Sequence, residues 1–310
     1  MLGSAICIKL KAKGFKNILL ATRQQLDLTN QKKVFEFFKK NKIDQVYLCA
    51  AKVGGIMSNK TYPADYIYSN LQITLNVVNA AKHFLVNRLL FIGSSCIYPR
   101  NAPQPMKEEY LLTSAMEKSN EPYAISKIAG IKICESYNRQ FNTDFRSVMP
   151  TNLYGDRDTY DDFNSHVIPA LILKFHKAKV NQNKQITLWG TGKAKREFLH
   201  ADDMANFCIK ILNLPKEKIL NNTKPQQSHI NLGTGEGITI KNLSNIIAKI
   251  VGYKGKIIFD SNYPDGHPKK INNINLQKKF NCIPSIDLIS GIRRSYKDYL
   301  KRHKDKNELF

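Results

Sequence analysis

Long hydrophobic runs are missing from this chain of 310 residues. The longest apolar stretch near its start, Leu2 to Leu10, is interrupted by Gly3, Ser4 and Lys9, so it is too short to cross a bilayer. The cleavage pattern of a secretory signal is also absent. We therefore expect a soluble, cytoplasmic protein with no membrane partner.

Cysteine and histidine are scarce and show no ligand spacing. No two cysteines form a Cys-x-x-Cys pair and no two histidines form a His-x-x-x-His pair, so neither a zinc site nor a disulfide framework is indicated. The six cysteines lie far apart along the chain, at Cys7, Cys49, Cys96, Cys134, Cys208 and Cys282. We expect reduced thiols and no bound metal.

Acidic residues are also few, since 25 Asp and Glu stand against 48 Lys and Arg and leave a net charge of +23. An excess of this sign suits nucleic acid, a membrane surface or small phosphorylated ligands. The lysines are spread over nearly every segment, and the tightest clusters, Lys9 to Lys16 and Lys301 to Lys306, lie near the ends. We therefore predict solvated faces and a site for a phosphorylated ligand, and expect no nucleic acid.

Internal repeats are absent, and the first half instead alternates short β-branched runs with helical patterns. This alternation is typical of an α/β fold with a doubly wound parallel sheet. The predicted strands are 17–21, 45–48, 88–92 and 145–149. The predicted helices are 30–41, 71–84, 123–140, 167–179, 201–212, 240–251 and 286–300.

The pattern loosens after Gly155, where helices mix with short strands and polar loops. We therefore expect a first domain over 1–155, to which part of 197–235 returns, and a smaller α/β domain over 156–310 that binds the substrate. Ligands of parallel sheets bind at the carboxyl ends of the strands. Polar or glycine-rich residues follow all four predicted strands there, at Arg23, 50–55, 93–96 and 150–155.

Tyr123 and Lys127 are four residues apart on a predicted helix and hence neighbours on one helix face. A phenol is a poor acid at neutral pH, but an adjacent cation stabilises the tyrosinate and should lower the pKa of Tyr123. Such a pair can donate a proton to a carbonyl oxygen. The spacing also arises by chance in a chain so rich in lysine, so its context decides.

That context is a set of motifs at the same predicted sheet edge. With them the sequence resembles the extended short-chain dehydrogenase/reductase family, and within it the enzymes that epimerise and reduce a GDP-4-keto-6-deoxy sugar. The resemblance runs from Gly3 to about Leu300. It rests on Ala50–Ile56, Gly93–Pro99, Asn120–Ala124 with Lys127, Val148–Gly155, Asn164–Pro169, and Arg196–His200 with Asp202 and Asp203.

The resemblance implies a Rossmann-type fold, the cofactor NADP(H), a GDP-sugar substrate and a homodimer joined through helices 71–84 and 123–140. It implies 3,5-epimerisation and 4-keto reduction of GDP-4-keto-6-deoxy-D-mannose to GDP-L-fucose. Tyr123, Lys127 and Ser94 would form the reductive triad. Cys96 and His166 would form the epimerisation pair, because a thiolate and an imidazole can exchange protons made acidic by the C4 ketone. Which of the two is the base stays open.

For the substrate, the resemblance assigns Lys174, Trp189, Arg196 and Asp265 to the GDP-sugar. Arginine suits a diphosphate through its fork of donors. Each role has an ordinary structural alternative. Trp189 would otherwise be a core residue, and Lys174 would lie on a solvated helix face.

The same holds for the catalytic candidates. Without the family, Cys96 is a small buried residue, His166 a loop or cap residue, and Ser94 a backbone partner at a strand end. His200, Asp202 and Asp203 read as the entrance of a helix, with a carboxylate capping the free amides.

For the cofactor, the resemblance assigns Gly3, Arg23, Ser94, Lys127, Pro150, Thr151, Asn152, Leu153 and His166. A cation such as Arg23 after the strand 17–21 favours the 2′-phosphate of NADP, unless it is a plain surface residue. The family's glycine-rich phosphate loop has three glycines after a first strand. Here only Gly3, the last of them, is present, and the first strand is missing. We expect the natural start to lie upstream, the alternative being a natively short chain.

Two other functions compete. One is a different nucleotide-sugar enzyme of the same superfamily, such as a 4-epimerase, which has no need for the pair of Cys96 and His166. A dehydratase is disfavoured because Ser95 and Cys96 stand where those enzymes place an Asp-Glu pair. The other is a non-catalytic binding protein built on a degenerate Rossmann domain, against which the complete set of Ser94, Tyr123 and Lys127 argues.

Overall fold

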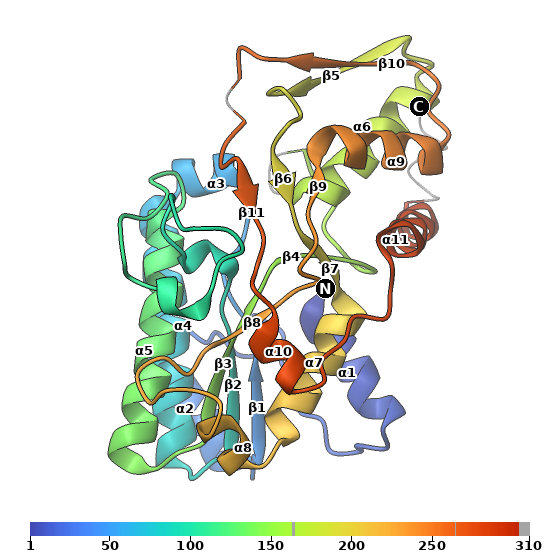
Figure 1. The fold of residues 1–310 in the computed structure, drawn as a ribbon. Helices are drawn as coiled ribbons and strands as arrows, with labels where there is room; N and C mark the ends of the chain where they lie inside the picture. Colours follow the sequence, from blue (N-terminus) through green and yellow to red (C-terminus); the bar gives the residue numbers. More distant parts are fainter. Residues whose placement is uncertain (163–164, 264, 304–310) are drawn as a thin grey trace.

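A parallel sheet of four strands lies between two layers of helices in the lower part of Figure 1. The computed structural model describes residues 1–162, 165–263 and 265–303. The strands are β1 (Gln45–Leu48), β2 (Arg88–Ile92), β3 (Phe145–Pro150) and β8 (Ile230–Leu232). They lie in the order β1-β2-β3-β8, and every neighbouring pair is parallel.

Helices cover both faces of this sheet, as Figure 1 shows. One face carries α2 (Gln31–Lys40), α4 (Pro63–His83) and α5 (Glu121–Phe141), and the other carries α1 (Leu2–Ala12) and α7 (Ala201–Asn213). Strand β2 serves both layers because its side chains alternate in direction. Leu89 and Phe91 belong to the first core, whereas Leu90 and Ile92 belong to the second. The α/β fold with a parallel sheet, predicted from the sequence, is confirmed.

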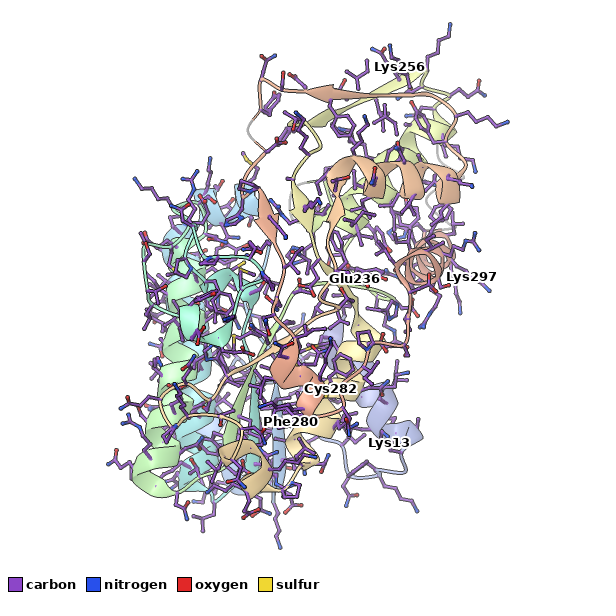
Figure 2. The ribbon with its side chains drawn as sticks, in the orientation of Figure 1. Lys13, Glu236, Lys256, Phe280, Cys282 and Lys297 are labelled. Carbon is purple, nitrogen blue, oxygen red and sulfur yellow. The ribbon has the colours of Figure 1, made fainter. Side chains whose placement is uncertain are left out.

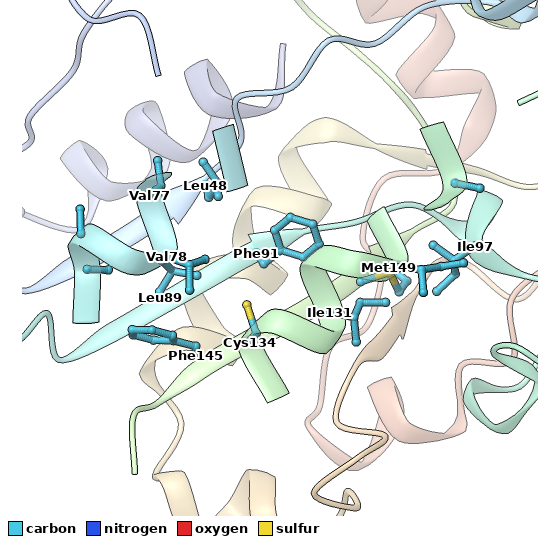
Figure 3. Close-up of a cluster of buried hydrophobic side chains, with 14 of the residues drawn as sticks. Leu48, Val77, Val78, Leu89, Phe91, Ile97, Ile131, Cys134, Phe145 and Met149 are labelled. Atoms are coloured by element: carbon cyan, nitrogen blue, oxygen red, sulfur yellow. The ribbon is translucent and has the colours of Figure 1, made fainter. Parts of the chain in front are cut away.

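The larger core lies between the sheet and the helices α4 and α5 (Figure 3). Phe91 and Phe145 of the sheet face Val78 of α4 and Cys134 of α5 within this cluster. Gly130 lets α5 approach the sheet closely, because a Cβ at this position would lie 2.2 Å from the ring of Phe91. The contact holds the middle of α5 against the second half of β2.

The strand predicted over 17–21 does not form. Residues 15–22 have no regular secondary structure, and Leu19 and Leu20 are 52% and 67% exposed. A strand needs a partner for its amides and carbonyls. Among the described residues β1 is the edge of the sheet, with Gln45, Val46 and Tyr47 only half-buried, and 17–21 pairs with no strand. Its hydrophobic pattern alone therefore does not make it a strand.

The second half of the chain surrounds a third hydrophobic core. The helices α6 (Val167–Val180), α9 (Ile240–Val251) and α11 (Leu288–Arg302) pack there, together with the parallel strands β5 (Gln185–Trp189) and β10 (Lys256–Asp260). The remaining elements are short: α3 (Ile56–Thr61), η1 (Ser95–Ile97), η2 (Glu108–Tyr110), β4 (Asn152–Tyr154), β6 (Lys195–Arg196), β7 (Phe198–His200), α8 (Lys216–Leu220), β9 (Ile238–Thr239), β11 (Lys269–Lys270) and α10 (Asn275–Lys279).

Helix α4 extends beyond its predicted start, since it begins at Pro63 rather than at Leu71. Proline suits the first turn of a helix, where its missing N–H costs nothing. The added turns bury Tyr66 and Asn70, and Asn70 exchanges two hydrogen bonds with the backbone of Lys52. Residues 63–70 lack a clear helical spacing of apolar residues, and tertiary contacts such as those of Asn70 stabilise the helix there instead.

The positive charge is distributed over separate elements. Figure 2 labels Lys13 beyond α1, Lys256 on β10 and Lys297 on α11, and all three side chains are exposed. Exposed lysines therefore lie on several faces of the molecule, as expected from their spread along the sequence. None of the described helices is long and apolar enough to cross a membrane.

We predict that Gly130→Ala destabilises the protein. Alanine favours a helix over glycine by about 1 kcal/mol, but the added methyl group collides with the buried ring of Phe91, and overpacking costs about 1–3 kcal/mol. Urea unfolding measures the difference. Phe91→Leu makes room, so Gly130→Ala should cost less in that background. A Gly130→Ala variant more stable than the wild type would show that the helix does not lie this close.

Candidate active site

The carboxyl ends of β1, β2 and β3 meet at one edge of the sheet, and most of the predicted site residues lie there. Cys49 follows β1, Gly93 follows β2 and Thr151 follows β3. Gly93 is required for close packing, because a Cβ there would lie 2.3 Å from the side chain of Met149. The backbone can therefore turn sharply after β2 and present the next residues at the edge.

Ser94 and Cys96 lie in the tight turn that follows. Ser94 caps the short helix η1, and its hydroxyl accepts a hydrogen bond from the backbone N–H of Cys96 at 3.2 Å. Ser95 and Ile97 of the same turn are buried, which leaves the side chains of Ser94 and Cys96 partly accessible at the sheet edge. A hydroxyl and a thiol are thus fixed next to each other by local backbone structure.

Helix α5 brings Tyr123 and Lys127 to the same edge. Lys127 is only 5% exposed, and its ammonium donates a hydrogen bond to the carbonyl of Ile92 at 2.9 Å. The ammonium nitrogen lies 5.1 Å from the ring centre of Phe91 and 5.8 Å from that of Tyr123. Burial lowers the pKa of Lys127 to about 8. The predicted neighbours on one helix face are therefore spatial neighbours of the end of β2.

The expected lowering of the pKa of Tyr123 is wrong for this structure. Burial raises the pKa of its phenol, and the nearby thiol of Cys96 adds to the rise, while the hydroxyl of Ser94 opposes it. Lys127 does not reverse this effect because its ammonium is held on the carbonyl of Ile92 and is itself easier to deprotonate. Tyr123 is thus a protonated phenol at neutral pH, which is the form that donates a proton.

Cys96 has a partner that the sequence did not predict. The ammonium of Lys270, on β11, donates a hydrogen bond to Sγ of Cys96 at 3.1 Å. Burial by itself would raise the pKa of this thiol, but Lys270, the hydroxyl of Ser94 and the charge of Arg196 together bring it below its usual value. The pKa of Cys49 moves the other way, since burial raises it to about 12.

His166 lies apart from these groups in the described structure. It is the residue before α6, its side chain is exposed, and it makes no capping hydrogen bond. Its charge acts on Asp158, whose pKa burial raises and His166 lowers. No hydrogen bond or ring contact joins His166 to Cys96 within the described ranges, and Asn164 of the motif lies outside them.

Apart from Ser94, Lys127 and His166, the residues expected to hold the cofactor lie in three places. Gly3 is in the first turn of α1, where an added Cβ would lie 3.7 Å from Cys49, so the N-terminal end of α1 adjoins the end of β1. Arg23 is exposed in a turn, after a segment that is not a strand. The third place is the chain after β3, with Pro150, Thr151, Asn152 and Leu153.

Thr151 and Asn152 are tied to the neighbouring chain. The hydroxyl of Thr151 and the side-chain amide of Asn152 donate to the same carbonyl of Glu197, at 3.1 and 2.8 Å. The backbone N–H of Thr151 also donates to the carbonyl of Leu232 at 2.9 Å. These polar side chains therefore fix the path of the chain past the sheet edge.

The residues expected to hold the nucleotide-sugar lie on β5, β6, α6 and the chain before β11. Trp189 ends β5, is 60% exposed, and stacks on Tyr263 with ring centres 4.7 Å apart. It is therefore not a core residue, which was the alternative. Lys174 projects from the exposed side of α6 and donates to the carbonyl of Thr187 on β5.

Arg196 and Asp265 carry opposite charges that interact, and Arg196 also acts on the thiol of Cys96. The guanidinium of Arg196 donates to the carbonyls of Lys195 and His267, and burial lowers its pKa against the opposing charge of Asp265. Asp265 accepts hydrogen bonds from Thr191, which lower the pKa of its carboxyl. Arg196 also acts on Cys96, so it connects the expected substrate residues with the thiol.

Sequence reasoning missed a buried carboxylate, Glu197, which is fully buried. It accepts hydrogen bonds from the backbone N–H groups of Thr234, Gly235 and Asn272. Burial raises its pKa and these amides oppose the rise. The available signal was a carboxylate directly before the apolar pair Phe198 and Leu199, but the partners of Glu197 are distant in sequence.

The predicted helix entrance at His200 is correct in place but wrong in detail. The imidazole of His200, not a carboxylate, accepts the capping hydrogen bond from the N–H of Asp202 at 3.2 Å. Asp203 instead accepts three hydrogen bonds from Ser285 and Ile286, and Asp202 pairs with Lys9 and Arg294. Both carboxylates thus hold separate parts of the chain together, and their partners are too distant in sequence for the local pattern to show.

A parallel sheet with a hydroxyl, a phenol and a buried lysine at the carboxyl edge of its strands defines a dinucleotide-dependent enzyme class. The family model described as "NAD dependent epimerase/dehydratase family" matches residues 1–233. The chain belongs to this family, and it is a nicotinamide-dependent enzyme.

Within this family, three of the relatives that the chain is similar to act on or make GDP-sugars. The GDP-L-fucose synthase of Escherichia coli is 50% identical over 97% of this chain and 94% of its own length. Among solved structures, a GDP-6-OMe-4-keto-L-xylo-heptose reductase from C. jejuni is 34% identical with a TM-score of 0.92, over 97% of this chain and 95% of its own. A GDP-mannoheptose C4 reductase from Campylobacter jejuni, solved with NADP bound, is 36% identical with a TM-score of 0.87, over 96% and 94%. The resemblance to GDP-L-fucose synthases read from the motifs is thereby confirmed.

We predict that the stability difference between the wild type and Lys127→Met depends on pH. The pKa of Lys127 is lowered in the folded state, so the unfolded chain binds its proton more tightly and wild-type stability rises with pH between about 8 and 10.5. From pH 7 to pH 9.5 the wild type should gain about 2 kcal/mol relative to the variant. Urea unfolding at both pH values measures this gain.

A matched control is Lys39→Met, which removes an exposed lysine of α2. The stability difference between this variant and the wild type should stay constant between the two pH values. An equally constant difference for Lys127→Met would mean that Lys127 is solvated, contrary to the structure.

Proposed function

We propose that the protein converts GDP-4-keto-6-deoxy-D-mannose to GDP-L-fucose by 3,5-epimerisation and NADPH-dependent reduction at C4. The observation that carries the proposal is the convergence of Ser94, Cys96, Tyr123 and Lys127 where β2 ends and α5 begins. These groups supply what the two steps need, namely a proton donor to a ketone oxygen and a thiol whose thiolate form can accept a proton from carbon.

In the reductive step, Tyr123 donates its phenolic proton to the C4 oxygen. The raised pKa of Tyr123 keeps this proton in place until negative charge develops on the ketone oxygen. Ser94 stabilises the same oxygen through its hydroxyl. Lys127, whose ammonium is held on the carbonyl of Ile92 and lies 5.8 Å from the ring centre of Tyr123, keeps a positive charge near the tyrosinate that remains. A bound nicotinamide supplies the hydride.

In the epimerisation steps, the C4 ketone makes the protons at C3 and C5 acidic because their loss gives an enolate. Cys96 and His166 exchange these protons on opposite faces of the ring. The hydrogen bonds from Tyr123 and Ser94 that serve the reduction also stabilise the enolate oxygen. The one hydroxyl-phenol pair thus serves both reactions.

The residues present fit a dinucleotide at the sheet edge. The N-terminal end of α1 at Gly3 offers free backbone N–H groups beside the end of β1, which is a favourable place for a phosphate. Arg23 binds the 2′-phosphate that distinguishes NADP from NAD. The chain from Pro150 to Leu153, with His166, Ser94 and Lys127, completes the nicotinamide end.

The GDP-sugar is bound by the second half of the chain, and we divide the molecule accordingly into an NADP-binding domain over 1–155, with part of 197–235, and a substrate domain over 156–310. Arg196 and Lys174 bind the diphosphate, and Asp265 binds a sugar hydroxyl. The exposed ring of Trp189, already stacked on Tyr263, offers its other face to the ligand.

The protein acts in the cytoplasm as a homodimer joined through α4 and α5. Exposed apolar side chains on these helices support this arrangement, since Tyr68 is 63%, Leu75 47% and Ile125 42% exposed in the single chain. Large apolar side chains left exposed in the single chain are consistent with an interface at these helices.

We predict that Tyr123→Phe lowers the rate of NADPH oxidation by about 100- to 10,000-fold, because the proton donor is lost. The assay supplies GDP-4-keto-6-deoxy-D-mannose and NADPH in D2O and follows absorbance together with deuterium at C3 and C5. Tyr68→Phe, on the exposed side of α4, is the control and should keep wild-type rates. Full activity of Tyr123→Phe would overturn the reductase.

We predict that Arg23→Glu weakens NADPH binding by about 10- to 100-fold, because a charge-assisted contact to the 2′-phosphate is worth about 1.5–3 kcal/mol. Binding of NADH, which lacks this phosphate, should change little. Fluorescence titration measures both dissociation constants. Arg139→Glu makes the same charge change on the exposed end of α5 and should alter neither. If Arg23→Glu weakens the binding of NADPH and NADH equally, Arg23 does not select for the 2′-phosphate.

A further inference from the structure

The contact between Lys270 and Cys96 joins two parts of the chain that are 174 residues apart. The ammonium nitrogen lies 3.1 Å from Sγ, within hydrogen-bond distance for sulfur. Lys270 is half-buried and Cys96 is partly accessible. Their approach therefore places a cation next to the thiol at the edge that carries Ser94 and Tyr123.

The backbone around Lys270 is held from several sides. Strand β11 pairs in parallel with β6, and this register sets Lys270 opposite Arg196. The next residue, Ile271, accepts a hydrogen bond from the N–H of Met106 at 2.8 Å and donates to the side chain of Gln104 at 2.9 Å. After it, the N–H of Asn272 donates to the buried carboxylate of Glu197 at 2.7 Å. The backbone position of Lys270 is thus fixed by the fold.

Both charged side chains that act on Cys96 lower the pKa of its thiol. Lys270 faces it from β11, Arg196 from β6 and the uncharged hydroxyl of Ser94 from its own turn. Tyr123 of α5 is the titratable neighbour on the remaining side, and it is a neutral phenol. No acidic side chain is among the groups that act on this thiol in the described structure.

We infer that Lys270 is a positioning residue that holds Cys96 as a thiolate, aimed from the turn after β2 toward the substrate carbon. The inference rests on the proposed function for its purpose, but the ion pair itself is a property of the free protein. The thiolate takes a proton from carbon, the electron pair of that C–H bond moves onto the C4 oxygen, and Lys270 remains protonated. The proton then on sulfur returns to solvent or to the sugar.

The experiment measures the reactivity of Cys96 without substrate. Iodoacetamide alkylation of the peptide that contains Cys96 is followed by mass spectrometry across pH 5 to 10, since only the thiolate reacts. In Lys270→Met the midpoint should rise by at least about one pH unit, and alkylation at pH 7 should fall about tenfold. Lys270→Arg keeps the charge and should restore most of the wild-type profile.

Lys269→Met is the matched control, because Lys269 is the exposed neighbour on the same short strand and makes no contact with Cys96. Its alkylation profile should equal that of the wild type. Far-ultraviolet circular dichroism of each variant shows whether it folds. If folded Lys270→Met keeps the wild-type alkylation midpoint, the inference is wrong.

Turnover separates this result from the proposed function. With GDP-4-keto-6-deoxy-D-mannose in D2O, Lys270→Met should lose deuterium incorporation at C3 and C5 through a lower kcat at neutral pH, and recover part of it at higher pH. A purely structural role would not give this pH-dependent recovery. A wild type that shows the alkylation behaviour but never turns over this substrate would refute the proposed function while leaving the ion pair intact.

Discussion

The buried ammonium of Lys127 is the interaction on which the site depends. It is 5% exposed, and it donates a hydrogen bond of 2.9 Å to the carbonyl of Ile92 at the end of β2. That bond fixes the first turns of α5 against the strand, and the close contact of Gly130 with Phe91 keeps the helix at this distance. A buried charge costs stability, and the hydrogen bond to the carbonyl of Ile92 offsets part of that cost.

Burial shifts the pKa values of three ionisable groups at this sheet edge, Tyr123, Lys127 and Cys96. It raises the pKa of the Tyr123 phenol and lowers that of the Lys127 ammonium to about 8, because it disfavours the charged form of each. It would raise the pKa of Cys96 too, but Lys270, the hydroxyl of Ser94 and the charge of Arg196 together reverse the direction. A protonated phenol and a thiol with a lowered pKa therefore lie at the same sheet edge.

A second constraint joins the sheet edge to the strands that carry those cations. The buried carboxylate of Glu197 accepts hydrogen bonds from the chain after β8 and from Asn272 next to β11, and its carbonyl accepts from Thr151 and Asn152 after β3. Each of these segments lies at the boundary between the sheet and the second half of the chain. The position of Lys270 relative to Cys96 therefore depends on the polar centre at Glu197.

Local patterns were enough to predict the strands at 45–48, 88–92 and 145–149, and the helix that sets Tyr123 four residues before Lys127, because alternation and helical spacing are properties of neighbouring residues. Only the tertiary structure decided the rest. Strand 17–21 does not form, since a strand needs a partner, and the pKa of Tyr123 rises rather than falls, since burial depends on the whole fold. Lys270 meets Cys96 across 174 residues through the pairing of β6 with β11, which no local pattern encodes.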